Sequence, residues 1–186
     1  GGTKDFYGGP PRGEVLDTRA YAGVVSYEPT ELVITARAGT RLTEIQETLR
    51  EKGQMLAFEP PHFGPDATLG GCVATGLSGP RRAHAGAVRD FLLGVRLLDG
   101  NGAKLRFGGQ VIKNVAGYDV SRLMAGALGT LGVLLEASLK VLPIPPAEAT
   151  LCFAASAPDA VEKMQRWGGT PLPLSAACHM DGVLYI

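Results

Sequence analysis

Runs of apolar and β-branched residues near the start of the chain predict short strands. Residues 15–17 and 24–27 are the first two runs, and residues 32–38 (LVITARA) mix β-branched with small side chains. This composition favours strands, because β-branched side chains pack well on a pleated surface. We therefore expect three strands before the first helix.

Apolar residues then recur at the helical period. Leu42, Ile45 and Leu49 fall on one face, Thr40 can cap the N-terminus, and Gly53 offers a left-handed stop after the last turn. The pattern predicts one clear helix between Thr40 and Gly53.

The middle of the chain predicts a loop, a short helix and a hairpin. Two prolines in FEPPHFG (residues 58–64) forbid a regular element there, and a short helix can cover residues 68–76. Residues 91–98 and 103–107 lie on either side of Asp-Gly-Asn-Gly, a strong turn sequence. Because a hairpin is antiparallel, it favours an α+β fold over a doubly wound parallel sheet.

A long apolar strand at residues 132–142 ends in a cluster of prolines, which cannot continue a strand ladder. We therefore expect a main domain over residues 1–144 and the beginning of a truncated second domain over residues 147–186. A strand at 150–154 and a helix at 158–167 are expected in the second part. The chain starts without Met and ends inside an apolar run, so we also expect a piece of a longer protein.

Charge and cysteine content exclude several classes of function. Lys plus Arg and Asp plus Glu are both 18, so no net field draws the chain to nucleic acid. Cys72, Cys152 and Cys178 are far apart and odd in number, which predicts no disulfide framework, no metal site and a reducing compartment. With no membrane-spanning run and no signal core, we expect a cytoplasmic protein that meets a membrane only through partners.

The candidate ligand-binding segments of the chain are rich in glycine. Glycine-rich segments occur at residues 1–9, 65–82 and 126–132. Where glycine removes the side chain, backbone N–H groups can approach a phosphate or a flat polar ring. Each segment alone is weak evidence, since glycine turns are common, but together they predict a nucleotide site.

Taken with KNVAGYD at residues 113–119, these segments resemble the FAD-binding domain of the vanillyl-alcohol-oxidase superfamily, called PCMH-type. Within it they are most similar to the E-subunit branch of bacterial glycolate oxidases. The resemblance covers about the first three quarters of the chain. It implies two α+β subdomains with FAD extended between them.

The resemblance also implies the cofactor-binding residues. The matching positions are Gly1, Gly2, Thr3 and Lys4 at the pyrophosphate loop; Thr68, Leu69, Gly70 and Gly71 beside the diphosphate and ribityl chain; Thr75, Gly76, Ser78 and Gly79 at the flavin ring; and Gly132 and Val133 near the adenine. The strand and first loop residues that precede Gly1 in the family are absent, so we expect little FAD on this fragment. Thr3 and Lys4 stand where some relatives attach flavin through His, which implies noncovalent FAD.

The function implied is that of an FAD-binding subunit of a glycolate (2-hydroxy acid) oxidase complex. Its partners would be a catalytic flavoprotein subunit and an iron–sulfur subunit, and its substrate a small 2-hydroxy acid. Ala127 and Leu128 replace the Ser and Glu of many relatives, which motivates an alternative, a structural or electron-relay subunit without a substrate. A nicotinamide site at residues 126–132 is disfavoured, because the GxGxxG spacing is missing and a strand follows.

No catalytic residue can be assigned from the sequence. His62, His84 and His179 are scattered and are expected in loops or on the surface. For Arg81 and Arg82, pairing with an acid group of a ligand and a solvated basic turn are equally open. Lys113 and Asn114 are candidate flavin-pocket donors, Asp119 is a helix cap, and Cys72 is expected to be a buried packing thiol.

Overall fold

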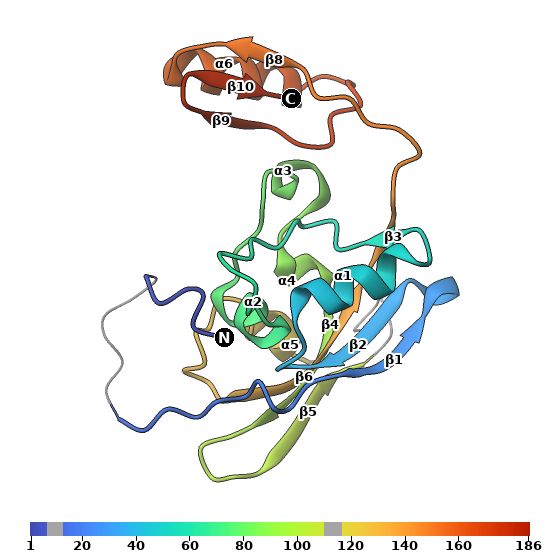
Figure 1. The fold of residues 1–186 in the computed structure, drawn as a ribbon, viewed down its shortest axis with the longest axis vertical. Helices are drawn as coiled ribbons and strands as arrows, with labels where there is room; N and C mark the ends of the chain where they lie inside the picture. Colours follow the sequence, from blue (N-terminus) through green and yellow to red (C-terminus); the bar gives the residue numbers. More distant parts are fainter. Residues whose placement is uncertain (7–12, 110–116) are drawn as a thin grey trace.

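The computed structural model describes residues 1–6, 13–109 and 117–186, and its centre is an antiparallel sheet of five strands in the order β1-β2-β6-β4-β5 (Figure 1). The strands are β1 (Val24–Glu28), β2 (Val33–Arg37), β4 (Leu92–Leu98), β5 (Lys104–Gly108) and β6 (Val133–Lys140). Every neighbouring pair in this sheet is antiparallel. The expected α+β fold is therefore confirmed.

The turn between β4 and β5 is stabilised by local interactions that its sequence predicts. The Asp99 carboxylate accepts hydrogen bonds from the N–H groups of Asn101 (2.9 Å) and Ala103 (2.8 Å), and Gly102 has a φ of +79°. An aspartate that bonds its own following backbone and a glycine at positive φ are what this turn requires.

Short helices cover one face of the five-stranded sheet (Figure 1). They are α1 (Leu42–Arg50), α2 (Leu69–Thr75), α4 (Val88–Phe91) and α5 (Val120–Leu123), with α3 (Arg82–Ala85) farther out and the 3₁₀ turn η1 (Pro29–Glu31) between β1 and β2. The core lies between these helices and the sheet, where Ile34, Ile45 and Leu139 are fully buried.

The predicted helix α1 is confirmed, and its apolar stripe Leu42, Ile45 and Leu49 is completely buried. The predicted cap is wrong, because Arg41 occupies the cap position. The Thr40 hydroxyl instead accepts from the Gly23 N–H (2.9 Å) and donates to the Gly23 carbonyl (3.2 Å). Thr40 thus ties the chain before β1 to the end of β2.

The strand predicted at residues 15–17 is also wrong. No described strand includes these residues, and the side chains of Val15 and Leu16 are exposed. These residues have the apolar pattern of a strand, but a strand also needs a neighbouring strand with which it forms hydrogen bonds.

The C-terminal part forms a second, smaller sheet of β8 (Cys152–Ala154), β10 (Val183–Tyr185) and β9 (Cys178–Met180), packed with α6 (Ala157–Gly168). A two-stranded sheet pairs β3 (Gln54–Met55) with β7 (Leu142–Pro143). Figure 1 shows the small sheet apart from the large one, joined by the chain after β7. The division into domains at residues 144–147 stays a prediction. No helix among the described residues is long and apolar enough to cross a membrane.

Candidate cofactor-binding site

The described parts of the three glycine-rich segments meet at α2. Residues 126–132 contact its C-terminal end, where the N–H groups of Gly126 and Leu128 donate to the carbonyls of Val73 (3.0 Å) and Ala74 (2.8 Å). Gly76, which ends α2 with a φ of +68°, lies so close that a Cβ there would be 2.9 Å from the Gly126 Cα. Gly76 permits this close approach because it has no Cβ, and Gly126 is a glycine at a positive φ of +86°.

The first segment and α2 enclose a polar pocket of about 140 Å³. It is lined by Gly1, Gly2, Thr3, Lys4, Asp5, Thr68, Gly71 and Thr75. All but Asp5 were predicted from the sequence. A water molecule takes about 30 Å³ in the liquid, and pockets for whole ligands usually exceed about 300 Å³. The volume of this pocket therefore suits a diphosphate group and not a whole dinucleotide.

The backbone N–H groups in the first turn of α2 already have hydrogen-bond acceptors within the protein. The N–H groups of Leu69 and Gly70 donate to the carbonyls of Thr40 (2.9 Å) and Ala38 (2.8 Å), and the Gly71 N–H donates to the Thr68 hydroxyl (3.2 Å). The expectation of bare N–H groups is therefore wrong at these three positions. The Thr68 hydroxyl accepts this bond and keeps its own proton for a ligand.

Gly70 and Gly71 differ in what they face. A Cβ at Gly70 would lie 2.8 Å from the Ala38 Cβ and 3.0 Å from its carbonyl oxygen, so Gly70 lets α2 pack on the end of β2. A Cβ at Gly71 would meet only the Thr68 hydroxyl, at 3.3 Å. Of the two, Gly71 lines the pocket.

The other predicted site residues do not line this pocket: they are Leu69, Gly70, Gly76, Ser78, Gly79, Gly132 and Val133. Leu69 is buried in the core. The Ser78 hydroxyl accepts from the Val88 N–H (3.0 Å), and a Cβ at Gly132 would be 2.7 Å from the Leu98 carbonyl oxygen. These contacts hold loops and strands together.

Lys4 is the cationic group of the pocket. Burial lowers the pKa of Lys4, and the neighbouring Cys72 acts in the opposite direction. Its ammonium nitrogen is 5.9 Å from the centre of the Phe63 ring. A partly desolvated ammonium attracts an anion more strongly than one in water.

Cys72 lies behind the pocket and is fully buried. Burial raises the pKa of its thiol to about 12, while Lys4 lowers it by a smaller amount. The thiol is therefore neutral at physiological pH, and the prediction of a buried packing cysteine is confirmed.

Arg81 is committed to two carboxylates. Its backbone N–H (2.8 Å) and its Nε (3.1 Å) donate to Glu59, and its Nη2 donates to Glu148. Neither of the two open alternatives describes Arg81, because only 15% of its side chain is exposed and both carboxylates hold it: it is neither a free partner for a ligand acid group nor a solvated turn residue. Sequence reasoning missed both partners, because they lie 22 and 67 positions away with no local signal. Arg82, at the start of α3, is exposed.

The remaining candidates have simple surroundings. Lys113 and Asn114 lie outside the described residues. Asp119 caps α5, as predicted, by accepting from the Arg122 N–H (3.1 Å). A ring nitrogen of His179 bonds the Ala155 carbonyl (2.9 Å). Over residues 1–6, 13–109 and 117–186 no group of His, Cys, Asp and Glu could hold a metal ion.

The chain is similar in sequence to known proteins. The family described as FAD binding domain matches residues 1–108. The chain is 54% identical over 184 residues to glycolate oxidase subunit GlcE of Escherichia coli (strain K12), which covers 99% of this chain and 53% of that subunit. It is 31% identical over 128 residues to glycolate oxidase subunit GlcD of Bacillus subtilis (strain 168), covering 69% of this chain and 27% of that subunit. The chain thus spans about half the length of the first relative.

A solved structure of alkyldihydroxyacetonephosphate synthase has a similar fold. It superposes with a TM-score of 0.66 at 25% identity and covers 80% of this chain and 27% of that chain. The likeness extends over most of the described elements and over only a part of the larger enzyme.

Substitution of the two neighbouring glycines separates packing from ligand contact. We expect Gly70→Ala to lower the free energy of unfolding by about 1–3 kcal/mol, because the new methyl group overlaps Ala38. Gly71→Ala should change it by less than about 1 kcal/mol, since alanine favours a helix and meets only a hydroxyl. Urea denaturation followed by circular dichroism measures both, and equal losses would contradict the role assigned to Gly70.

The thiols provide a second check. In the native protein at mildly alkaline pH, we expect iodoacetamide to modify the exposed Cys152 and to leave Cys72 unmodified, because the Cys72 thiol is buried and its pKa is about 12. Peptide mass spectrometry reports each site, and the same reaction in denaturant is the control. Labelling of native Cys72 as fast as Cys152 would show that the thiol is accessible.

Proposed function

The chain belongs to the family of FAD-binding domains, and from this premise we propose that it is the flavin-binding part of a subunit of a 2-hydroxy-acid oxidase complex. The family match confirms the resemblance and the PCMH-type α+β fold expected from the glycine segments, and it identifies the cofactor as FAD. The observation that carries the proposal is the pocket that joins residues 1–4 to Thr68, Gly71 and Thr75 within the matched region.

The donors of this pocket fit the diphosphate of FAD. Lys4 supplies a positive charge, the Thr68 hydroxyl supplies a proton, and the missing side chain of Gly71 leaves room for phosphate oxygens. Asp5 also lines the pocket, and its carboxylate opposes an anion there. Because Lys4 is partly desolvated, a phosphate beside it would raise its lowered pKa again and secure the charged form.

Bound FAD would supply an acceptor for two electrons. The role that we propose for the chain itself is to bind the diphosphate and fix its position. The flavin-ring residues Thr75, Gly76, Ser78 and Gly79 and the adenine residues Gly132 and Val133 remain proposals. Of these, only Thr75 shares the pocket with the diphosphate group.

The relatives support a subunit of a larger assembly. GlcE and GlcD are both named as glycolate oxidase subunits, and they match 99% and 69% of this chain. We therefore propose a catalytic flavoprotein subunit and an iron–sulfur subunit as partners and a small 2-hydroxy acid as substrate.

A second candidate, an electron-relay subunit without a substrate of its own, is supported by Leu128. Its backbone has a φ of +52° and its side chain is half exposed. A leucine at this position can neither move a proton nor bind a hydroxy acid by a hydrogen bond. The two candidates differ in whether electrons come from the hydroxy acid directly or from another subunit.

The diphosphate site is tested by removing its charge. We expect Lys4→Gln to raise the dissociation constant for FAD by roughly 10- to 100-fold in the full-length protein, since a charge-assisted hydrogen bond contributes about 1.5–3 kcal/mol. Titration calorimetry measures the constant. Lys52→Gln, an exposed lysine after α1, is the matched control, and Lys4→Arg should restore part of the affinity. Equal affinity of Lys4→Gln and wild type would exclude the proposed site.

Anaerobic addition of glycolate distinguishes the two candidates. If the subunit oxidises a hydroxy acid directly, the visible flavin absorbance of the isolated full-length protein should bleach within the time of a turnover of the complex. If it is a relay, bleaching should require the catalytic subunit. Addition of dithionite is the control that the bound flavin can be reduced.

A further inference from the structure

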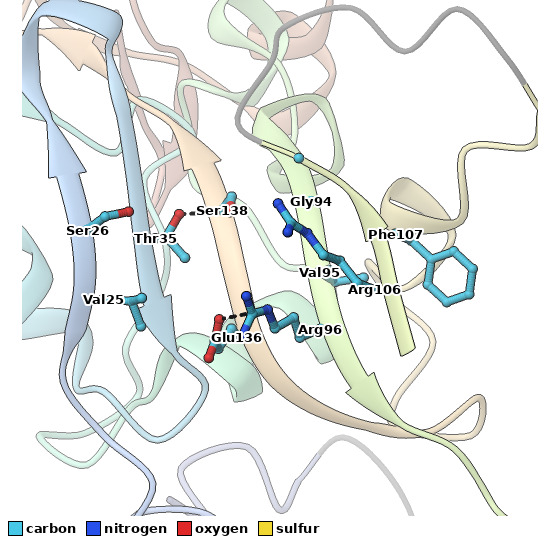
Figure 2. Close-up of a pocket in the computed structure, with 11 residues that line it drawn as sticks. Val25, Ser26, Thr35, Gly94, Val95, Arg96, Arg106, Phe107, Glu136 and Ser138 are labelled. Atoms are coloured by element: carbon cyan, nitrogen blue, oxygen red, sulfur yellow. Dashed lines mark hydrogen bonds and ion pairs between the residues drawn. The ribbon is translucent and has the colours of Figure 1, made fainter. Parts of the chain in front are cut away.

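The face of the five-stranded sheet opposite the helices carries a row of charged side chains (Figure 2). Arg37 of β2 is directly opposite Glu136 of β6, Glu136 is opposite Arg96 of β4, and Arg96 is opposite Arg106 of β5. Residues directly opposite in an antiparallel sheet point to the same face. We call Arg37, Glu136, Arg96 and Arg106 the arginine row, and Lys104, two residues before Arg106, lies on the same face.

Glu136 is the carboxylate of the row, and among the described residues it forms an ion pair with Arg96. Glu136 is 8% exposed; its Oε2 lies 3.4 Å from the Arg96 Nε, and its Oε1 accepts from the Tyr21 hydroxyl (3.2 Å). The Arg37 guanidinium lies over the Tyr21 ring, 5.1 Å from its centre. Across the described part of the chain, no carboxylate forms an ion pair with Lys104 or Arg106. The face therefore keeps an excess of positive charge, although the whole chain has none.

The pairing of Arg96 with Arg106 is unfavourable for folding. Like charges directly opposite in a sheet repel and destabilise it. A hydrophobic or oppositely charged residue at position 106 would stabilise the isolated sheet better. An anion placed above the two guanidinium groups would remove this repulsion.

The surface around the row is open and has a floor of small side chains. Two hollows of about 90 and 360 Å³ adjoin it, and both are lined by Arg96, Arg106 and Glu136. Figure 2 shows Arg96 turned towards Glu136, and Arg106 lying across β4 towards Ser138. Gly94 lets the Gly109 backbone pack closely beside β4, since a Cβ at Gly94 would be 2.7 Å from the Gly109 carbonyl oxygen, and both glycines line the smaller hollow. Carboxylates from outside can therefore reach the guanidinium groups.

We infer that this face docks an acidic segment of a partner protein subunit, whose Asp and Glu carboxylates pair with Arg106, Lys104 and the outer nitrogens of Arg96. The inference rests on the proposed function in one respect, that the protein acts in a complex. The mixture of arginine with a tyrosine and with the exposed apolar Val25 is typical of protein interfaces. The chain's lack of net charge argues against a nucleic acid as the occupant.

The experiment reverses the charges of Lys104 and Arg106, which form no ion pair within residues 1–6, 13–109 and 117–186. Lys104→Glu/Arg106→Glu in the full-length protein should weaken assembly with the catalytic flavoprotein and iron–sulfur subunits by at least about tenfold, and the wild-type complex should weaken as salt is raised. Lys52→Glu/Arg89→Glu makes the same charge change at exposed positions away from this face and should assemble normally. Surface plasmon resonance with the purified partner subunits gives the dissociation constants.

The FAD content of each variant is measured in the same samples. A Lys104→Glu/Arg106→Glu protein that keeps its flavin but loses its partners supports the docking face. Normal assembly of this variant, equal weakening of the Lys52→Glu/Arg89→Glu control, or failure of the wild type to bind the partners each overturns it. Binding of a single-stranded DNA oligonucleotide that is lost only in the Lys104→Glu/Arg106→Glu variant, with partner assembly unchanged, also overturns it. Wild-type protein that binds the partners without retaining FAD would instead refute the proposed function and leave the docking face intact.

Discussion

The packing of α2 on the end of β2 is the constraint on which the site depends. Gly70 allows the contact, and the carbonyls of Ala38 and Thr40 accept the first N–H groups of the helix. These bonds satisfy donors that would otherwise face the ligand. The helix is thereby fixed in place by the protein alone, and in the proposed site the groups left to bind an anion are Lys4 and the Thr68 hydroxyl.

Elements whose causes are local were predictable from the sequence. The hairpin at Asp99 and the cap of α5 by Asp119 each depend on a side chain within four residues of its partner. Thr40 and residues 15–17 were predicted wrongly because their surroundings come from distant parts of the chain. A sequence pattern contains the periodicity of an element but not the neighbour that it needs.

The candidate site also has features that the sequence predicts and features that it does not. The sequence identified most residues of the pocket through the glycine segments and the family that they resemble. It did not separate glycines that line the pocket, such as Gly71, from packing glycines such as Gly70 and Gly132, because both kinds occur in the same motifs. Nor could it reveal the arginine row, since the register between β4, β5 and β6 exists only in the folded sheet.

Arg81 links the loop before α2 to the C-terminal part of the described structure through two ion pairs. It contacts Glu59 in the loop before α2 and Glu148 in the chain that leads to the small C-terminal sheet, while the Ala177 N–H reaches the neighbouring Pro80 carbonyl (3.5 Å). The pKa of Glu148 is lowered, chiefly by its hydrogen bond to Arg81, so this tether is complete at neutral pH and is lost as the pH falls through that lowered value. The ion pair and the Ala177–Pro80 hydrogen bond thus link the small sheet to the loop before α2, and protonation of Glu148 would remove the first of these links.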